Sequence, residues 1–176
     1  MTPLSAQEVI DLLRLEPLPL EGGYYRETFR APIVVGEEGL PADYYGDRNA
    51  STAIYFLVTP EENSALHVLP SDEVFHFYRG DPVEMLRLYP DGVGSVATLG
   101  PDLAGGQRPQ VVVPGGVWQG CRLAGGGAWA LLGCTVAPGF DFRDFHVATP
   151  VDILDLVDRY PQHEEMIRSL SPRPLE

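Results

Sequence analysis

Hydrophobic and polar residues alternate with a period of two over most of residues 51–147, which is the spacing of side chains on the two faces of a β-strand. Glycine, proline and aspartate separate these short runs at intervals of about ten residues, a pattern typical of an antiparallel sandwich or barrel. The expected strands cover residues 51–59, 64–69, 73–80, 83–90, 95–100, 109–114, 117–123, 128–136 and 140–148.

Other elements are predicted on both sides of this region. Residues 5–8 read Ser-Ala-Gln-Glu, a capping box that begins a short helix. Thr149 followed by Pro150 is the signature of an N-cap with proline at the first helical position, so helices are expected over about 149–170. The absence of repeats and low-complexity linkers favours one all-β domain with short terminal helices.

The run Tyr-Tyr-Arg-Glu-Thr-Phe-Arg over residues 24–30 also alternates like a strand. Tyr25 and Phe29 share one face, and we expect that face to point into the core. Arg26 and Arg30 share the other face, which would then form an outer surface or a dimer contact. The functional alternative for Arg26 is a contact to a carboxylate or phosphate group of a ligand.

Composition excludes several classes of function. The formal net charge is −13, which argues against binding to a nucleic-acid backbone or an anionic membrane surface. All twelve cationic residues are arginine, so Schiff-base chemistry and a phosphate-binding P-loop lysine are excluded. Without a long apolar run or a basic, apolar leader, we expect a cytoplasmic protein that does not enter a membrane.

Two cysteines, Cys121 and Cys134, flank a glycine-rich turn. They lack the spacing of a zinc ribbon. Buried free thiols are the favoured interpretation in a reducing compartment. A disulfide across a hairpin is the alternative.

The segment from Ser64 to Pro82 carries the residues with the clearest chemistry. His76 follows Glu73 at an odd offset, so an unbroken strand directs these two side chains to opposite faces. Phe75 and Phe77 share the face of Glu73, which we expect to point inward. His76 is then predicted to be an interface or second-layer histidine.

The spacing of residues in two segments resembles the two sequence motifs of the cupin superfamily. His67, Glu73 and Gly80 match the first motif, and Pro114 and Gly116 match the second. Residues 21–30, 71–82, 108–120 and 133–145 together resemble the cupin 5 family. This resemblance implies a single-domain jelly-roll β-barrel over residues 1–176, with its core at about 21–147, and it implies a homodimer.

The departures from the motifs bear on metal binding. Leu69 and Gln119 stand where the superfamily pattern has two histidines. The remaining candidate ligands of a divalent metal are His67, Glu73 and Gln119, which would make a weak site because a neutral amide is a poor donor for softer metals.

Three functions remain open. The first is an isomerase, epimerase or lyase that acts on a sugar-like or acidic metabolite, with His67 and Glu73 as an acid–base pair. The second is a cupin that binds a small-molecule ligand without turnover. The third is a metal-dependent oxygenase. The residues expected to contact the ligand are Gln119, Phe75, Phe77 and Arg26.

Overall fold

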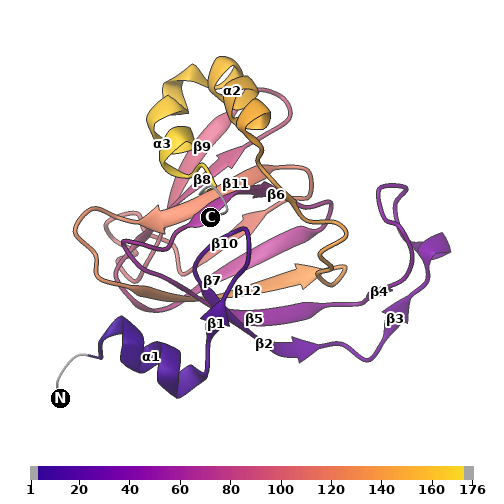
Figure 1. Ribbon diagram of the computed structural model, residues 1–176, viewed down its shortest axis with the longest axis horizontal. Helices are drawn as coiled ribbons and strands as arrows, with labels where there is room; N and C mark the ends of the chain where they lie inside the picture. Colours follow the sequence, from indigo (N-terminus) through magenta and orange to yellow (C-terminus); the bar gives the residue numbers. More distant parts are fainter. Residues whose placement is uncertain (1–3, 173–176) are drawn as a thin grey trace.

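Two antiparallel sheets face each other in the computed structural model, which describes residues 4–172 (Figure 1). One sheet has the order β1 (Glu16–Pro17), β2 (Tyr24–Arg30), β5 (Thr52–Val58), β12 (Ala130–Ala137), β7 (Asp72–Gly80) and β10 (Gln110–Val113). The other has the order β13 (His146–Val147), β6 (Ser64–Val68), β11 (Trp118–Leu123), β8 (Val83–Leu88) and β9 (Gly94–Leu99). A short pair, β3 (Val34–Val35) with β4 (Arg48–Asn49), stands apart.

The strand order confirms an all-β fold of the jelly-roll type. Within the described residues, strand pairing does not join the two sheets into a closed barrel, so the barrel takes the form of a sandwich. Crossovers between the sheets bring β6 and β7, which are consecutive in sequence, onto opposite layers. The interior therefore receives side chains from both.

The helices are α1 (Ala6–Leu13), η1 (Glu37–Gly39), α2 (Pro150–Arg159), η2 (Pro161–His163) and α3 (Glu164–Ser169). Residues of α1 pack against the six-stranded sheet and residues of α2 and α3 against the five-stranded sheet, whereas η1 lies in the segment between β3 and β4 (Figure 1). Ser5 and Thr149 each form the predicted cap, and each accepts a hydrogen bond from the third residue of its helix. Among the described residues, none of these helices is long and apolar enough to cross a membrane.

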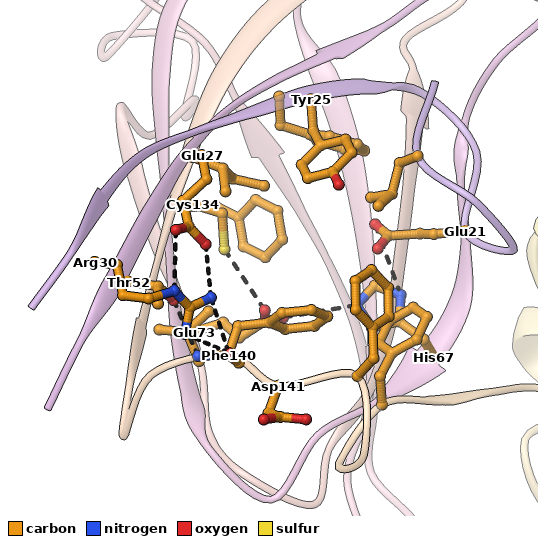
Figure 2. Close-up of a pocket in the computed structure, with 17 residues that line it drawn as sticks. Glu21, Tyr25, Glu27, Arg30, Thr52, His67, Glu73, Cys134, Phe140 and Asp141 are labelled. Atoms are coloured by element: carbon orange, nitrogen blue, oxygen red, sulfur yellow. Dashed lines mark hydrogen bonds and ion pairs between the residues drawn. The ribbon is translucent and has the colours of Figure 1, made fainter. Parts of the chain in front are cut away.

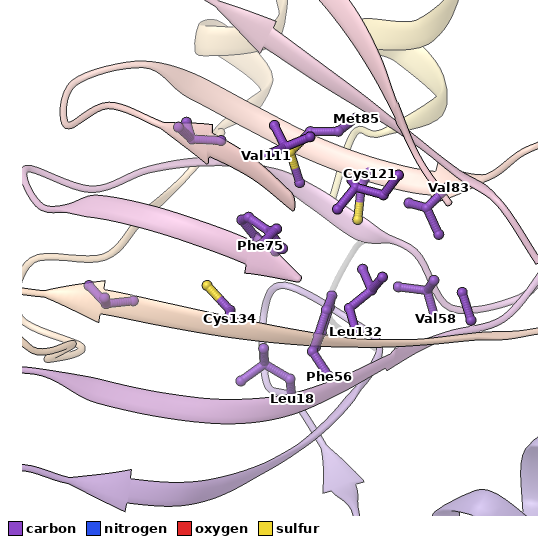
Figure 3. Packing of buried hydrophobic residues seen from close by; sticks show 14 of the residues in the cluster. Leu18, Phe56, Val58, Phe75, Val83, Met85, Val111, Cys121, Leu132 and Cys134 are labelled. Atoms are coloured by element: carbon purple, nitrogen blue, oxygen red, sulfur yellow. The ribbon is translucent and has the colours of Figure 1, made fainter. Parts of the chain in front are cut away.

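The main core lies between the sheets (Figure 3). Phe56, Phe75 and Leu132 from the six-stranded sheet pack with Val83 and Met85 from the five-stranded sheet. Both cysteines lie in this core as free thiols, which confirms the favoured interpretation. Burial raises the pKa of each thiol well above its usual value, so the thiols stay neutral and behave as small apolar side chains.

A β-bulge in β2 reverses part of the predicted alternation. Pairing with β5 skips one residue between Glu27 and Phe29, and an extra residue exchanges the two faces of everything that follows it. Phe29 is therefore 52% exposed, and the expectation that it joins Tyr25 in the core was wrong. Arg30, expected outside, faces the interior instead.

The predicted last strand, over residues 140–148, is mostly a loop. Only His146 and Val147 pair in a sheet. In the preceding residues 138–145, which we call the aromatic loop, the rings of Phe140, Phe142 and Phe145 contact one another with centroids 5.0–6.2 Å apart. The alternation of aromatic and polar residues here serves this ring cluster rather than the face of a sheet.

A buried ion pair holds the aromatic loop in place. Arg48 in β4 donates from Nε and Nη2 to the two carboxylate oxygens of Asp144, at 2.6 and 2.5 Å. The two side chains are 1% and 2% exposed. Nη1 of Arg48 also donates to three backbone carbonyls of residues 45–47, so the charged group has the hydrogen bonds that a buried ion needs.

Arg48→Ala should lower the free energy of unfolding by about 3–5 kcal/mol, because it leaves the Asp144 carboxylate buried without its counter-charge. Arg143→Ala is the matched control. It breaks a bidentate pair with Asp141 in the same loop, but the side chain of Arg143 is 57% exposed, and such pairs contribute about 1 kcal/mol or less. Urea denaturation measures both losses. Equal losses would contradict an anchoring role for the buried pair.

Candidate functional site

A cavity of about 360 Å³ lies within the sandwich, between the six-stranded sheet, the aromatic loop and the inner end of β6 (Figure 2). Its walls are largely apolar, with Phe56 and Phe75 on the sheet side and the rings of the aromatic loop opposite. A concave, mostly apolar cavity with a few converging polar groups is the usual form of a small-molecule site.

His67 in β6 points into this cavity and is 2% exposed. Its Nδ1 donates to the backbone carbonyl of Ala65 at 2.8 Å. This bond assigns a proton to Nδ1 and directs Nε2 towards Glu73, whose Oε2 lies 3.6 Å away. The ring of Phe145 packs beside the imidazole, with centroids 5.1 Å apart.

Glu73 in β7 is buried at 5% exposure and reaches His67 from the opposite sheet. Gln119 in β11 donates an amide hydrogen to its Oε2. The thiol of Cys134 lies 3.6 Å from its Oε1. Gln119 is the cross-strand neighbour of His67 and reaches Glu73 from the same facing sheet. It is not one of the residues that line the cavity, so its place is that of a positioning residue.

Glu21 is a third ionisable group of the site, and the sequence interpretation missed it. Its Oε1 accepts a hydrogen bond from the Ser64 hydroxyl at 2.6 Å and lies 3.9 Å from Nδ1 of His67. The tight turn that aims it inward needs the two glycines that follow, with φ of +91° at Gly22 and +72° at Gly23. A Cβ at Gly23 would also lie 2.7 Å from the ring of Phe56. The Gly-Gly pair was the available signal.

The electrostatics of the site favour a charged imidazole. Burial lowers the pKa of His67, but Glu21, Glu73 and the Ala65 carbonyl outweigh it and raise the pKa to about 9. Burial raises the pKa of Glu21, against the opposing effects of His67 and Ser64. At neutral pH the cavity therefore holds an imidazolium, whose Nε2 proton is directed at Glu73.

At the other end of the cavity, Arg30 and Glu27 form a bidentate ion pair, with bonds of 3.0 and 2.6 Å. Figure 2 shows this pair on the side of the cavity away from His67. Both residues belong to β2. Glu27 precedes the bulge and shares the inward face of Tyr25, and the bulge turns Arg30 to the same side. The two side chains are 39% and 40% exposed.

The remaining candidate ligand-contact residues fall on different surfaces. Phe75 lines the cavity. Phe77 packs against the main core and is not among the lining residues. Arg26 lies outside the cavity, with its guanidinium 5.5 Å from the centroid of the Tyr55 ring. The predicted ligand contacts of Phe77 and Arg26 therefore have no support from this cavity.

His76 lies on the other face of the six-stranded sheet, as its odd offset from Glu73 predicts. Its Nε2 is 3.3 Å from the Thr135 hydroxyl, and its Nδ1 is 3.3 Å from the amide of Gln110. Its ring is nearly parallel to that of Tyr78. A role in an interface stays a prediction.

The donors in the cavity do not fit a divalent metal. The three ligands expected from the motif positions are the imidazole of His67, the carboxylate of Glu73 and the amide of Gln119, and the last does not line the cavity. Nε2 of His67 and the amide N–H of Gln119 both face the Glu73 carboxylate, and Leu69 is a buried apolar side chain. A divalent ion usually takes three or four protein ligands. The described residues contain no group of three or more His, Cys, Asp or Glu side chains arranged to hold one.

The comparison with known families agrees with this fold. The model of the Cupin_5 family, described as cupin superfamily (DUF985), matches residues 7–148. The chain belongs to this cupin family. The Saccharomyces cerevisiae relative "Uncharacterized protein YML079W" is 33% identical over 150 residues, 81% of this chain and 74% of the yeast protein.

Solved structures superpose on most of this chain. A hypothetical protein from Leishmania major superposes with a TM-score of 0.83 at 36% identity, covering 97% of this chain and all of the other. Protein SO0799 from Shewanella oneidensis gives 0.81 at 35% identity, covering 98% of this chain and all of the other. Oxalate decarboxylase from Bacillus subtilis gives a TM-score of 0.52 at 14% identity, covering 91% of this chain and 38% of the decarboxylase. That likeness shows the fold alone.

The raised pKa of His67 predicts a pH dependence of stability. Its stabilising contribution is fully present below pH 6.5, the unfolded value, and is lost as the pH rises to about 9. Between these pH values we expect the free energy of unfolding of the wild type to fall by roughly 3 kcal/mol more than that of His67→Gln. Urea denaturation over this pH range tests it, and parallel pH profiles would contradict the charged, paired state of His67.

Proposed function

We propose that this cupin is an isomerase, epimerase or lyase that moves a proton on a small hydroxy-carbonyl compound, with His67 and Glu73 as the acid–base pair. The observation that carries the proposal is the 3.6 Å approach of the buried His67 imidazole to the Glu73 carboxylate in a largely apolar cavity. Perturbed ionisable groups in a cleft are candidates for catalysis.

In this proposal His67 acts as the hydrogen-bond donor and Glu73 as the base. Nε2–H of His67 donates to the carbonyl oxygen of the ligand and stabilises the negative charge that develops on it. Glu73 accepts the proton from the adjacent carbon, which leaves an enediolate. Return of the proton to the former carbonyl carbon, with transfer of the hydroxyl proton from one oxygen to the other, gives an isomer. Return of a proton to the other face of the original carbon gives an epimer. Departure of a β-substituent with its bonding electron pair, while the proton stays on Glu73, gives a lyase product.

The surroundings of Glu73 suit a base. Gln119 holds one carboxylate oxygen and the Cys134 thiol lies beside the other, so the group is oriented before a ligand enters. The apolar walls exclude water from the ligand, and electrostatic interactions are stronger in such surroundings.

The proposal is tested by hydrogen exchange in D2O. The protein is incubated with a panel of aldoses, ketoses and hydroxy acids, and NMR measures the incorporation of deuterium at the carbon next to the carbonyl group. We expect His67→Gln and Glu73→Gln to lower the exchange rate by about 100-fold or more, because acid–base groups contribute factors of about 10²–10⁴.

His76→Gln is the matched control, since this histidine lies on the opposite face of the same sheet, and it should exchange at the wild-type rate. A panel in which compounds bind to the wild type without any exchange would support a binding protein and overturn the enzymatic proposal.

The chain is also proposed to form a homodimer through the outer face of β7 and β10. That face exposes Tyr78 at 51% and Val112 at 47% next to His76, and β10 is a sheet edge whose unpaired backbone groups need cover. We expect sedimentation equilibrium to give twice the chain mass, and Val112→Asp to give the single-chain mass. A wild-type monomer at micromolar concentration would contradict the assembly.

A further inference from the structure

The lining of the cavity carries more negative than positive groups. Its carboxylates are Glu21, Glu27, Glu73 and Asp141, and its cations are Arg30 and His67. The whole chain, including these residues, carries a formal net charge of −13. A field of this sign lowers the local concentration of anions and opposes their entry.

Arg30 has no hydrogen-bond donor left for an anionic ligand. Nε and Nη2 donate to the two carboxylate oxygens of Glu27. Nη1 donates to the side chain of Asn49 at 3.0 Å, and both terminal nitrogens reach the carbonyl of Phe140, at 3.3 and 3.4 Å. A guanidinium has five N–H groups, and these five contacts use them.

His67 is also committed to protein groups. Its Nδ1 donates to the Ala65 carbonyl, and its charge is shared between Glu73 and Glu21, whose oxygens lie 3.6 and 3.9 Å from the ring nitrogens. A ligand that enters as an anion would meet the carboxylate of Glu73 beside Nε2. A neutral carbonyl group would not, because negative charge develops on its oxygen only as Glu73 takes up the proton and loses its own charge. Neither cation of the lining can therefore balance the charge of a phosphate or carboxylate.

The walls and the volume indicate what the cavity can accept. Tyr25, Phe140 and Phe142 present aromatic rings to the space, and ring faces attract weakly positive C–H groups. A volume of about 360 Å³ is near the lower end of the usual range for ligand sites, about 300–1,000 Å³. A single ring or short chain with hydroxyl groups fits these features better than a nucleotide-linked compound.

We propose that the cavity takes an uncharged hydroxy-carbonyl compound about the size of a monosaccharide, and that Glu27 excludes phosphorylated or carboxylated analogues by occupying the guanidinium of Arg30. The hydroxy-carbonyl part of this inference rests on the proposed function. The exclusion of anions does not, because it follows from the contacts of Arg30 and can be measured as binding.

The experiment uses inorganic phosphate as the probe, with calorimetric titration at low ionic strength. The wild type should show no saturable binding that depends on Arg30. Glu27→Gln frees Nη2 of Arg30, because the new amide nitrogen cannot accept a hydrogen bond, and it should bind phosphate at least about tenfold more tightly, since charge-assisted hydrogen bonds are the strong ones. Glu27→Gln/Arg30→Gln should lose that gain.

Asp141→Asn is the matched control. It removes one negative charge from the same lining, but the partner of Asp141 is Arg143, so Arg30 stays occupied and the gain should be absent. Thermal unfolding checks that each variant is folded, and Glu27→Ala serves if Glu27→Gln is not. Phosphate binding by the wild type that disappears in Arg30→Gln would overturn the inference, as would equal affinities of the wild type and the Glu27 variants.

The two proposals fail in different ways. Deuterium exchange with a free ketohexose that is no faster than with its 6-phosphate would leave the proton-transfer function standing and refute the selection of neutral compounds. Absence of exchange with every compound, together with the expected phosphate results, would refute the function and leave the exclusion of anions standing.

Discussion

The pairing of the buried His67 side chain with the carboxylates of Glu73 and Glu21 is the interaction on which the site depends. An imidazolium that is 2% exposed is stable only if opposite charges accompany it into the interior. Glu73 reaches it from the facing sheet, and Glu21 reaches it from the turn that precedes β2. The turn at Glu21 and the consecutive strands β6 and β7, which belong to opposite sheets, therefore have to meet at one point between the sheets, and the sandwich is arranged so that they do.

Other parts of the fold shield these three side chains from water and hold the walls of the cavity in place. The aromatic loop covers the cavity, and the buried pair of Arg48 with Asp144 holds that loop against β4. Arg30 adds bonds to the same loop through the Phe140 carbonyl. These arginines act within the protein: each has its charge balanced by a carboxylate, and each ties one wall of the cavity to another. A chain with arginine as its only cationic residue uses the planar, multidentate guanidinium for this purpose.

Much of the fold followed from local patterns. Period-two alternation predicted the longer strands of both sheets, and the Ser5 and Thr149 caps predicted the helices, because these signals depend on neighbours within a few residues. The spacing of His67 and Glu73 pointed to the site, and strand parity placed His76 on the other face. Parity failed at Phe29 and Arg30, since a single bulge opposite β5 exchanges the two faces and the bulge is decided by cross-strand pairing.

The sequence by itself determined most of the long strands, which face of an unbroken strand is apolar, and that lysine chemistry is absent, since these are properties of composition and short-range geometry. Only the tertiary structure decided that Glu21 lies next to His67, that Gln119 donates a hydrogen bond to Glu73, and that residues 138–145 form a loop over the cavity. Those outcomes depend on contacts between segments separated by tens of residues. Such contacts arise when the two sheets pack face to face, and no local pattern encodes the position of one sheet relative to the other.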